Sequence, residues 1–209
     1  MFLEILLEGA SDVPTVKEFL TRRFNLAEGE HFRIHPHKGK GKLPLNSLAR
    51  PDVKHRGLLD QLPAKLRGYA SLPPGYCVVV LVDSDKTNCQ ELKSALVQMY
   101  ESLDKRPTSV LLRIAVEETE SWFIADIDAV RKAYPKAKHQ RIAGIQPDSV
   151  VGAWERLAEA LGRQPLNCDG SDKCEWAEKI APHLDLEAPK SPSLKAFING
   201  VARFVERNL

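Results

Sequence analysis

The sequence lacks the features that would assign it to a membrane, secreted or repetitive class of protein. It has no apolar run of about 18 residues, the length that a helix needs to cross a bilayer, and no internal repeat or low-complexity segment. Its first residues place Glu4 inside an apolar run with no basic leader before it. We therefore expect no secretory signal peptide and no membrane partner.

Net charge is also nearly absent. The formal charge is +2 at pH 7, so the composition as a whole does not indicate nucleic-acid binding, and any such surface must be local. The chain has 209 residues, of which 43% are hydrophobic, enough to build one large domain or one domain with an appendage.

Cysteines are few for a chain of this length, and their four positions do not resemble a disulfide framework. Cys77 lies inside an apolar run and is expected to be a small core residue. Cys168 and Cys174 lie near His183, but their spacing fits none of the usual zinc-ligand pairs. A reducing cytoplasm is the simplest expected location.

Continuous apolar segments alternate with amphipathic segments through the first part of the chain. Strands are expected at residues 2–7, 31–35, 77–82 and 109–116, and helices at about 13–24, 56–69 and 88–103. This alternation predicts an α/β fold with a mainly parallel central sheet flanked by helices. We expect that core to span residues 1–130, with residues 131–209 forming a helical C-terminal extension packed on it.

The most informative stretch is the apolar run from Cys77 to Val82, which leads into Asp83 and Asp85. Such a run is typical of a strand buried on both faces, and open α/β sheets bind ligands at the carboxyl ends of their strands. On an extended chain both carboxylates would point the same way and repel each other. A cation with oxygen ligands, such as Mg²⁺, would relieve the repulsion. The alternative is an ordinary loop start, because Asp and Ser are common turn residues.

Acidic residues also follow two other predicted strands. Glu8 follows the first strand, and the segment from Glu117 to Glu120 follows the strand at 109–116. Each has a structural explanation by itself, as a solvated turn or as favourable charge at a helix start. In a parallel sheet, however, all three acidic ends meet at one edge, and this shared position favours a site.

A glycine-rich basic loop lies between residues 36 and 43. Lys38, Lys40 and Lys42 alternate with glycines, which leaves exposed backbone N–H groups beside mobile cations and suits phosphate or nucleic-acid binding. The order of residues is not that of a Walker A loop, so a nucleoside-triphosphatase is not indicated. A flexible, solvated loop is the equally simple alternative.

These motifs together resemble the TOPRIM superfamily and, beyond it, an uncharacterised bacterial TOPRIM-like family with a domain of unknown function. In chain order, the motifs are Glu8-Gly9, the Lys38 to Lys42 segment, Asp83-Ser84-Asp85, Glu118 to Asp126 (E-T-E-S-W-F-I-A-D) and Ser191 to Phe197 (S-P-S-L-K-A-F). The family often has an arginine before the first Glu of E-x-E, whereas this chain has Glu117. The resemblance implies a TOPRIM-like sheet and, because members are commonly encoded beside ATPases in defence-type gene clusters, an ATPase partner.

The leading functional hypothesis is a nuclease-like, Mg²⁺- or Mn²⁺-dependent enzyme that cleaves phosphodiesters. Asp83 and Asp85 would bind a metal and Glu8 would be a ligand or a general acid or base. Glu118 and Glu120 would be ligands of a second metal. Two alternatives remain: a catalytically silent module that binds a nucleotide or a partner, and a phosphoacceptor domain with Asp83 as the acceptor.

Overall fold

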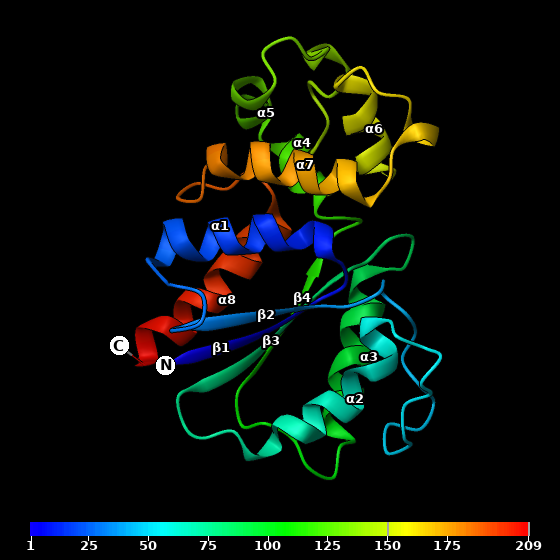
Figure 1. Cartoon of the computed structure of the whole chain (residues 1–209), viewed down its shortest axis with the longest axis vertical. Coiled ribbons are helices and arrows are strands. Elements are labelled where there is room, and N and C mark those ends of the chain that lie inside the picture. The colour runs from blue at the N-terminus through cyan, green and yellow to red at the C-terminus, as the bar shows by residue number, and fades with distance from the viewer. Residues whose placement is uncertain (150, 209) are drawn as a thin grey trace.

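The computed structural model, which describes residues 1–149 and 151–208, is built around a four-stranded sheet of order β2-β1-β3-β4 (Figure 1). All three strand pairings are parallel, so the predicted parallel α/β sheet is confirmed. The strands are β1 (Phe2–Leu7), β2 (Phe32–Pro36), β3 (Tyr76–Asp83) and β4 (Val110–Ala115).

Helices cover both faces of this sheet and also form a layer beyond its carboxyl edge. They are α1 (Val13–Phe24), α2 (Leu58–Gly68), α3 (Cys89–Glu101), α4 (Glu120–Ala125), α5 (Ile127–Ala133), α6 (Ala153–Ala160), α7 (Gly170–Ile180) and α8 (Pro192–Asn208). Short 3-10 turns occur at Ala10–Asp12, Tyr69–Ser71, His139–Arg141, Pro165–Asn167 and Ala181–His183. None of the helices described here has the length and apolar character needed to cross a lipid bilayer.

Strand β3 is central because its side chains are buried on both faces. Val78, Val80 and Val82 pack with α2 and α3, whereas Val79 and Leu81 belong to the core that includes α1 and α8. This explains the unbroken apolar run in the sequence, since a strand covered on both sides has no solvent-facing positions. Helices α3 and α8 lie on opposite sides of β4 (Figure 1).

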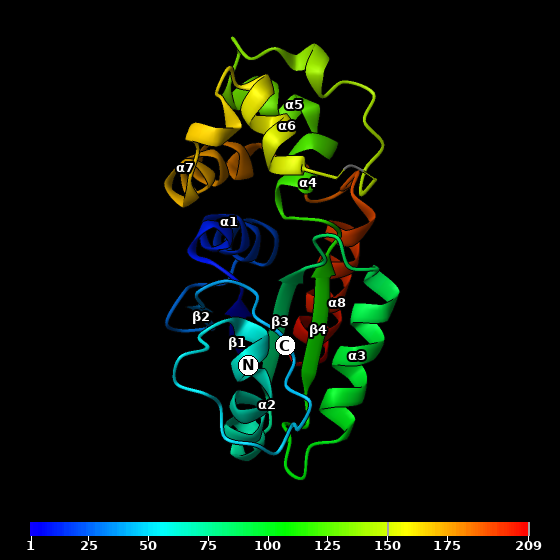
Figure 2. The ribbon, with the colours of Figure 1, turned by 90° about the vertical axis from the view of Figure 1, so that its right-hand side faces the viewer.

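The last helix returns to the sheet. Helices α4 to α7 gather beyond the carboxyl edge, with α7 beside α1, whereas α8 runs back along β4 (Figures 1 and 2). Phe197 of α8 stacks on Trp122 of α4, with ring centroids 6.0 Å apart. The expected boundary at residue 130 falls inside α5.

The helix predicted at residues 56–69 is present as α2, and it continues through Pro63. A proline in a helix interior removes one backbone donor. Here Pro63 is buried within the helix, and the helix continues to Gly68. Helix α3 begins after Asn88, whose side chain caps it by accepting from the backbone N–H groups of Gln90 and Glu91.

Candidate functional site

Glu8 and Asp83 meet at the carboxyl edge of the sheet, where the sequence predicted that they would. Glu8 follows β1, Asp83 is the last residue of β3, and the two strands are direct neighbours. The backbone N–H of Asp83 donates to Glu8 Oε2 at 3.3 Å. The side chain of Asp83 has no hydrogen-bond or ion-pair partner within the described residues, although other carboxylates surround it.

Asp12 joins this group, although its position just before a helix marks it in the sequence only as a possible helix cap. It lies in the 3-10 turn before α1 and is 6% exposed. One carboxylate oxygen accepts from Thr119 Oγ1 at 2.8 Å and the other from the backbone N–H of Gly9 at 3.3 Å. Because Thr119 precedes α4, the contact links the start of α1 to the loop after β4.

Glu118 and Glu120 complete the group. Both pair with a lysine side chain whose role the sequence did not reveal. Lys173 of α7 places Nζ 3.5 Å from Glu118 Oε1 and 3.6 Å from Glu120 Oε1. The same Nζ lies 5.2 Å from the ring centroid of Trp154 in α6, a cation–π contact. We call the carboxylates of Glu8, Asp12, Asp83, Glu118 and Glu120 the carboxylate cluster.

Burial and mutual repulsion raise the pKa of every carboxyl in the carboxylate cluster. Burial, with repulsion from Asp85 and Asp12, raises the pKa of Glu8 to about 7. Burial and the neighbouring Glu120 raise the pKa of Glu118 to about 8. Burial raises the pKa of Asp83 well above its ordinary value, and Asp12 and Glu8 raise it further. The pKa values of Asp12 and Glu120 rise mainly through burial.

The side chains of Asp85 and Asp83 do not share one direction, contrary to the extended geometry expected for D-x-D. Strand β3 ends at Asp83, and Asp85 takes a left-handed backbone conformation with φ 48°. Its exposed carboxylate lies 2.9 Å from Nζ of Lys40, which also donates to Ser84 O at 3.0 Å. The i, i+2 argument holds only while the chain stays extended, and here the chain turns after Asp83. Asp85 remains near enough to repel Glu8.

Glu117 has a structural role. Its carboxylate accepts from the backbone N–H groups of Gly152 at 2.6 Å and Ala153 at 3.0 Å, at the beginning of α6. Glu118 adds a longer contact to Trp154 N at 3.4 Å. An anion at a helix N-terminus is favourable because the first N–H groups have no partner within the helix. Glu117 therefore anchors the helical layer to the end of β4.

The three lysines of the glycine-rich loop differ in their surroundings. Lys40 reaches the carboxyl edge, whereas Lys38 and Lys42 are exposed. The loop is tied to the site through Gly39 N, which donates to Glu8 O at 3.0 Å.

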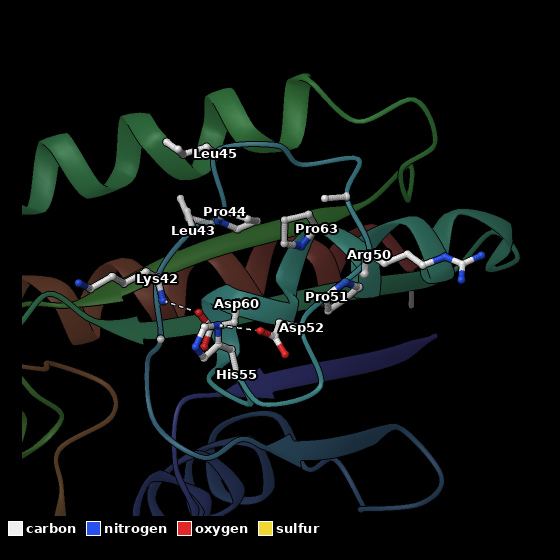
Figure 3. Close-up of a pocket in the computed structure, with 13 residues that line it drawn as sticks. Lys42, Leu43, Pro44, Leu45, Arg50, Pro51, Asp52, His55, Asp60 and Pro63 are labelled. Carbon is white, nitrogen blue, oxygen red and sulfur yellow. Dashed lines mark hydrogen bonds and ion pairs between the residues drawn. The ribbon is translucent and has the colours of Figure 1, made fainter.

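The rest of this loop, residues 42–56, arches over α2 and encloses a hollow of about 700 Å³ (Figure 3). Its two ends meet at Asp60, whose carboxylate accepts from Lys42 N at 3.0 Å and Gly57 N at 3.1 Å. A Cβ at Gly57 would lie only 2.5 Å from Gly41 Cα, so the closure requires glycine at residue 57. The loop also exposes apolar side chains, namely Leu45, Leu48 and Val53.

The carboxylate cluster offers the donors that a hard divalent cation requires. Mg²⁺ and Mn²⁺ prefer oxygen ligands, and the raised pKa values mean that the cluster is short of positive charge. Within residues 1–149 and 151–208, no three His, Cys, Asp or Glu side chains already stand in a metal-ligating arrangement. The fit therefore depends on the donor chemistry of the cluster.

Comparison with known protein families gives a match over most of the chain. The sequence model of a family described as a domain of unknown function (DUF4276) matches residues 7–202. No curated protein and no solved structure matches the chain. The matched range includes the whole carboxylate cluster together with Lys173.

Proposed function

The chain belongs to the DUF4276 family, and from its carboxylate cluster we propose a metal-dependent, nuclease-like enzyme that cleaves phosphodiester bonds in nucleic acid. The proposal includes a TOPRIM-like identity for the α/β core. It also includes a location in the cytoplasm, where the free cysteines would stay reduced.

The observation that supports the proposal is the convergence of buried carboxylates that have too little positive charge around them. Burying ionised carboxylates without compensation is costly, so such groups either bind protons or pair with cations. Among residues 1–149 and 151–208, Lys173 is the one cation with ion pairs to the cluster, and these pairs are with Glu118 and Glu120. A divalent ion would supply the missing charge.

Glu8, Asp12 and Asp83 are the ligands that we assign to Mg²⁺ or Mn²⁺, and Glu118 and Glu120 are the further oxygen donors of the site. When bound, the metal would neutralise the phosphodiester and favour ionisation of an attacking water. Asp85 and Lys40 lie at the exposed side of this edge, where the phosphate backbone would approach.

Lys38 and Lys42 would contact the flanking phosphates. Both are exposed on the loop that passes from the carboxyl edge toward α2, so a strand that enters the site would meet their ammonium groups. Phosphate contacts of this kind position a nucleic acid without reading its sequence.

A catalytically silent module that binds a partner ATPase is the second candidate. The exposed side chains of Leu45, Leu48 and Val53 favour it, since apolar groups gathered on one loop are suited to protein contact. In the leading proposal the same surface would bring an ATPase to the nuclease.

The test is cleavage of labelled single-stranded DNA, duplex DNA and RNA with Mg²⁺ or Mn²⁺, with and without a candidate partner ATPase. We expect metal-dependent cleavage by the wild type, loss of cleavage in Asp83→Asn, and retention in Asp52→Asn, whose carboxylate is exposed on the loop. Metal should raise the melting temperature of the wild type and of Asp52→Asn but not that of Asp83→Asn. Oligonucleotide or ATPase binding without cleavage under any of these conditions would favour the silent module.

A further inference from the structure

The carboxylate cluster divides into two parts that differ in charge compensation. Glu118 and Glu120 share the ammonium of Lys173, at 3.5 Å and 3.6 Å. Glu8, Asp12 and Asp83 have no ion-pair partner in the part of the chain that the structure describes. Asp83 nevertheless feels the repulsion of both Asp12 and Glu8.

Lys173 is held in place from several sides. Its side chain is 23% exposed, and it projects from α7, a helix that also contacts α1 and the turn at Ala10–Asp12. The indole of Trp154 lies under the ammonium. The two ion pairs with Glu118 and Glu120 favour the charged ammonium.

Resting on the proposed function, we propose that the ammonium of Lys173 takes the place of a second metal ion, so that this site binds a single divalent cation. Enzymes with two metals set them about 3.5–4 Å apart between shared carboxylates. Here one of those positions, next to Glu118 and Glu120, is filled by a cation that belongs to the protein.

The charges of the two parts agree with this assignment. When all five carboxyls are ionised, a divalent ion beside Glu8, Asp12 and Asp83 leaves that part with one net negative charge. Lys173 beside Glu118 and Glu120 leaves the other part with the same net charge. A second divalent ion would have to displace the ammonium, which would lose both ion pairs and force two cations close together.

The arrangement also implies a function for Lys173 itself. Its ammonium lies at the edge of the cluster that faces α6 and α7, fixed against Trp154. A phosphate group bound to the metal would therefore also face the fixed positive charge of Lys173. That position suits an electrostatic contact with the charge that develops in the transition state.

The number of bound ions tests the proposal without reference to activity. Mn²⁺ binding is measured by isothermal titration calorimetry and by the loss of the free-ion signal in electron paramagnetic resonance. The variants are the wild type, Lys173→Met, Lys173→Arg and Lys179→Met. Lys179 is the matched control, because it lies on the same helix but pairs with Glu175 at 2.6 Å, away from the cluster.

We expect one Mn²⁺ per chain in the wild type, in Lys173→Arg and in Lys179→Met, and two in Lys173→Met. Two ions in the wild type would overturn the role of Lys173 while leaving the metal site intact, as would one ion in a folded Lys173→Met protein. No ion in any variant would overturn the metal-dependent function itself. If Lys173→Met does not fold, Lys173→Gln replaces it, and the same counts decide the outcome.

Discussion

The free energy of unfolding in the absence of metal should fall as the pH rises from 5 to 8. Glu8 and Glu118 have pKa values raised to about 7 and about 8, and the pKa of Asp83 is also well above its ordinary value. In this pH range the native state therefore holds protons that the unfolded chain has released. Stability decreases with pH wherever the native state binds more protons than the unfolded chain. The contribution of these carboxyls is therefore fully present below about pH 4.5, and it is lost as the pH rises through their raised pKa values.

The size of the fall can be bounded from Glu8. Its pKa moves from 4.5 to about 7, and one pKa unit corresponds to about 1.4 kcal/mol, so Glu8 by itself contributes at most about 3.5 kcal/mol. Glu8 is partly exposed, and solvent screening reduces this figure. The carboxylates raise each other's pKa, so their shifts do not add. We expect a total fall of about 2–3 kcal/mol.

The assay is urea unfolding in EDTA at pH 5, 6, 7 and 8, followed by circular dichroism. Glu8→Gln should make the pH dependence shallower and should be more stable than the wild type at pH 8, because it removes one repelling charge. Excess Mg²⁺ should recover stability at pH 8, by about 2.7 kcal/mol at a hundred times the dissociation constant. Stability that rises between pH 5 and 8 in EDTA would refute the electrostatic description of the cluster.

Three further predictions concern the supports of the site. Glu117→Ala should lower the free energy of unfolding in urea by about 2–3 kcal/mol, because the first N–H groups of α6 lose their acceptor. Glu117→Gln should lower it less, and equal losses in the two variants would contradict the capping role. Gly57→Ala should destabilise by about 1–3 kcal/mol through a clash at the closed loop, whereas Gly68→Ala, which meets no atom within 4 Å, should stabilise slightly. In oligonucleotide titrations against salt, alanines at Lys38 and Lys42 should reduce the salt slope by about 0.7 per lost contact with single strands, and an unchanged slope would identify a solvated loop.

Local sequence patterns predicted most of the sheet. The run from Cys77 to Val82 lies within β3, and the strand expected at 109–116 is β4, shorter by one residue at each end. These predictions succeed because burial on both faces leaves a continuous apolar signal that needs no knowledge of neighbours. The convergence of Glu8 with Asp83 followed from topology, since the ends of adjacent parallel strands lie at one edge.

The sequence could not distinguish carboxylates of the site from carboxylates with structural roles. Glu117 and Glu118 are adjacent in the chain, yet one caps α6 and the other contacts Lys173. Asp12 has the features of a helix cap, and only its contact with Thr119 places it in the cluster. Asp85 turns away from Asp83 because its backbone is left-handed, a conformation that residue type alone does not predict.

The sequence by itself thus determined the alternation of strands and helices and the edge at which acidic groups gather. Both follow from patterns within a few residues, where backbone geometry fixes the direction of each side chain. The tertiary structure decided which carboxylates face one another and which cation lies among them. Lys173 belongs to a helix far along the chain from Glu118, and no local pattern links the two. Their contact exists because α7 packs against the start of α1, so the charge balance of the site is a property of the packed molecule.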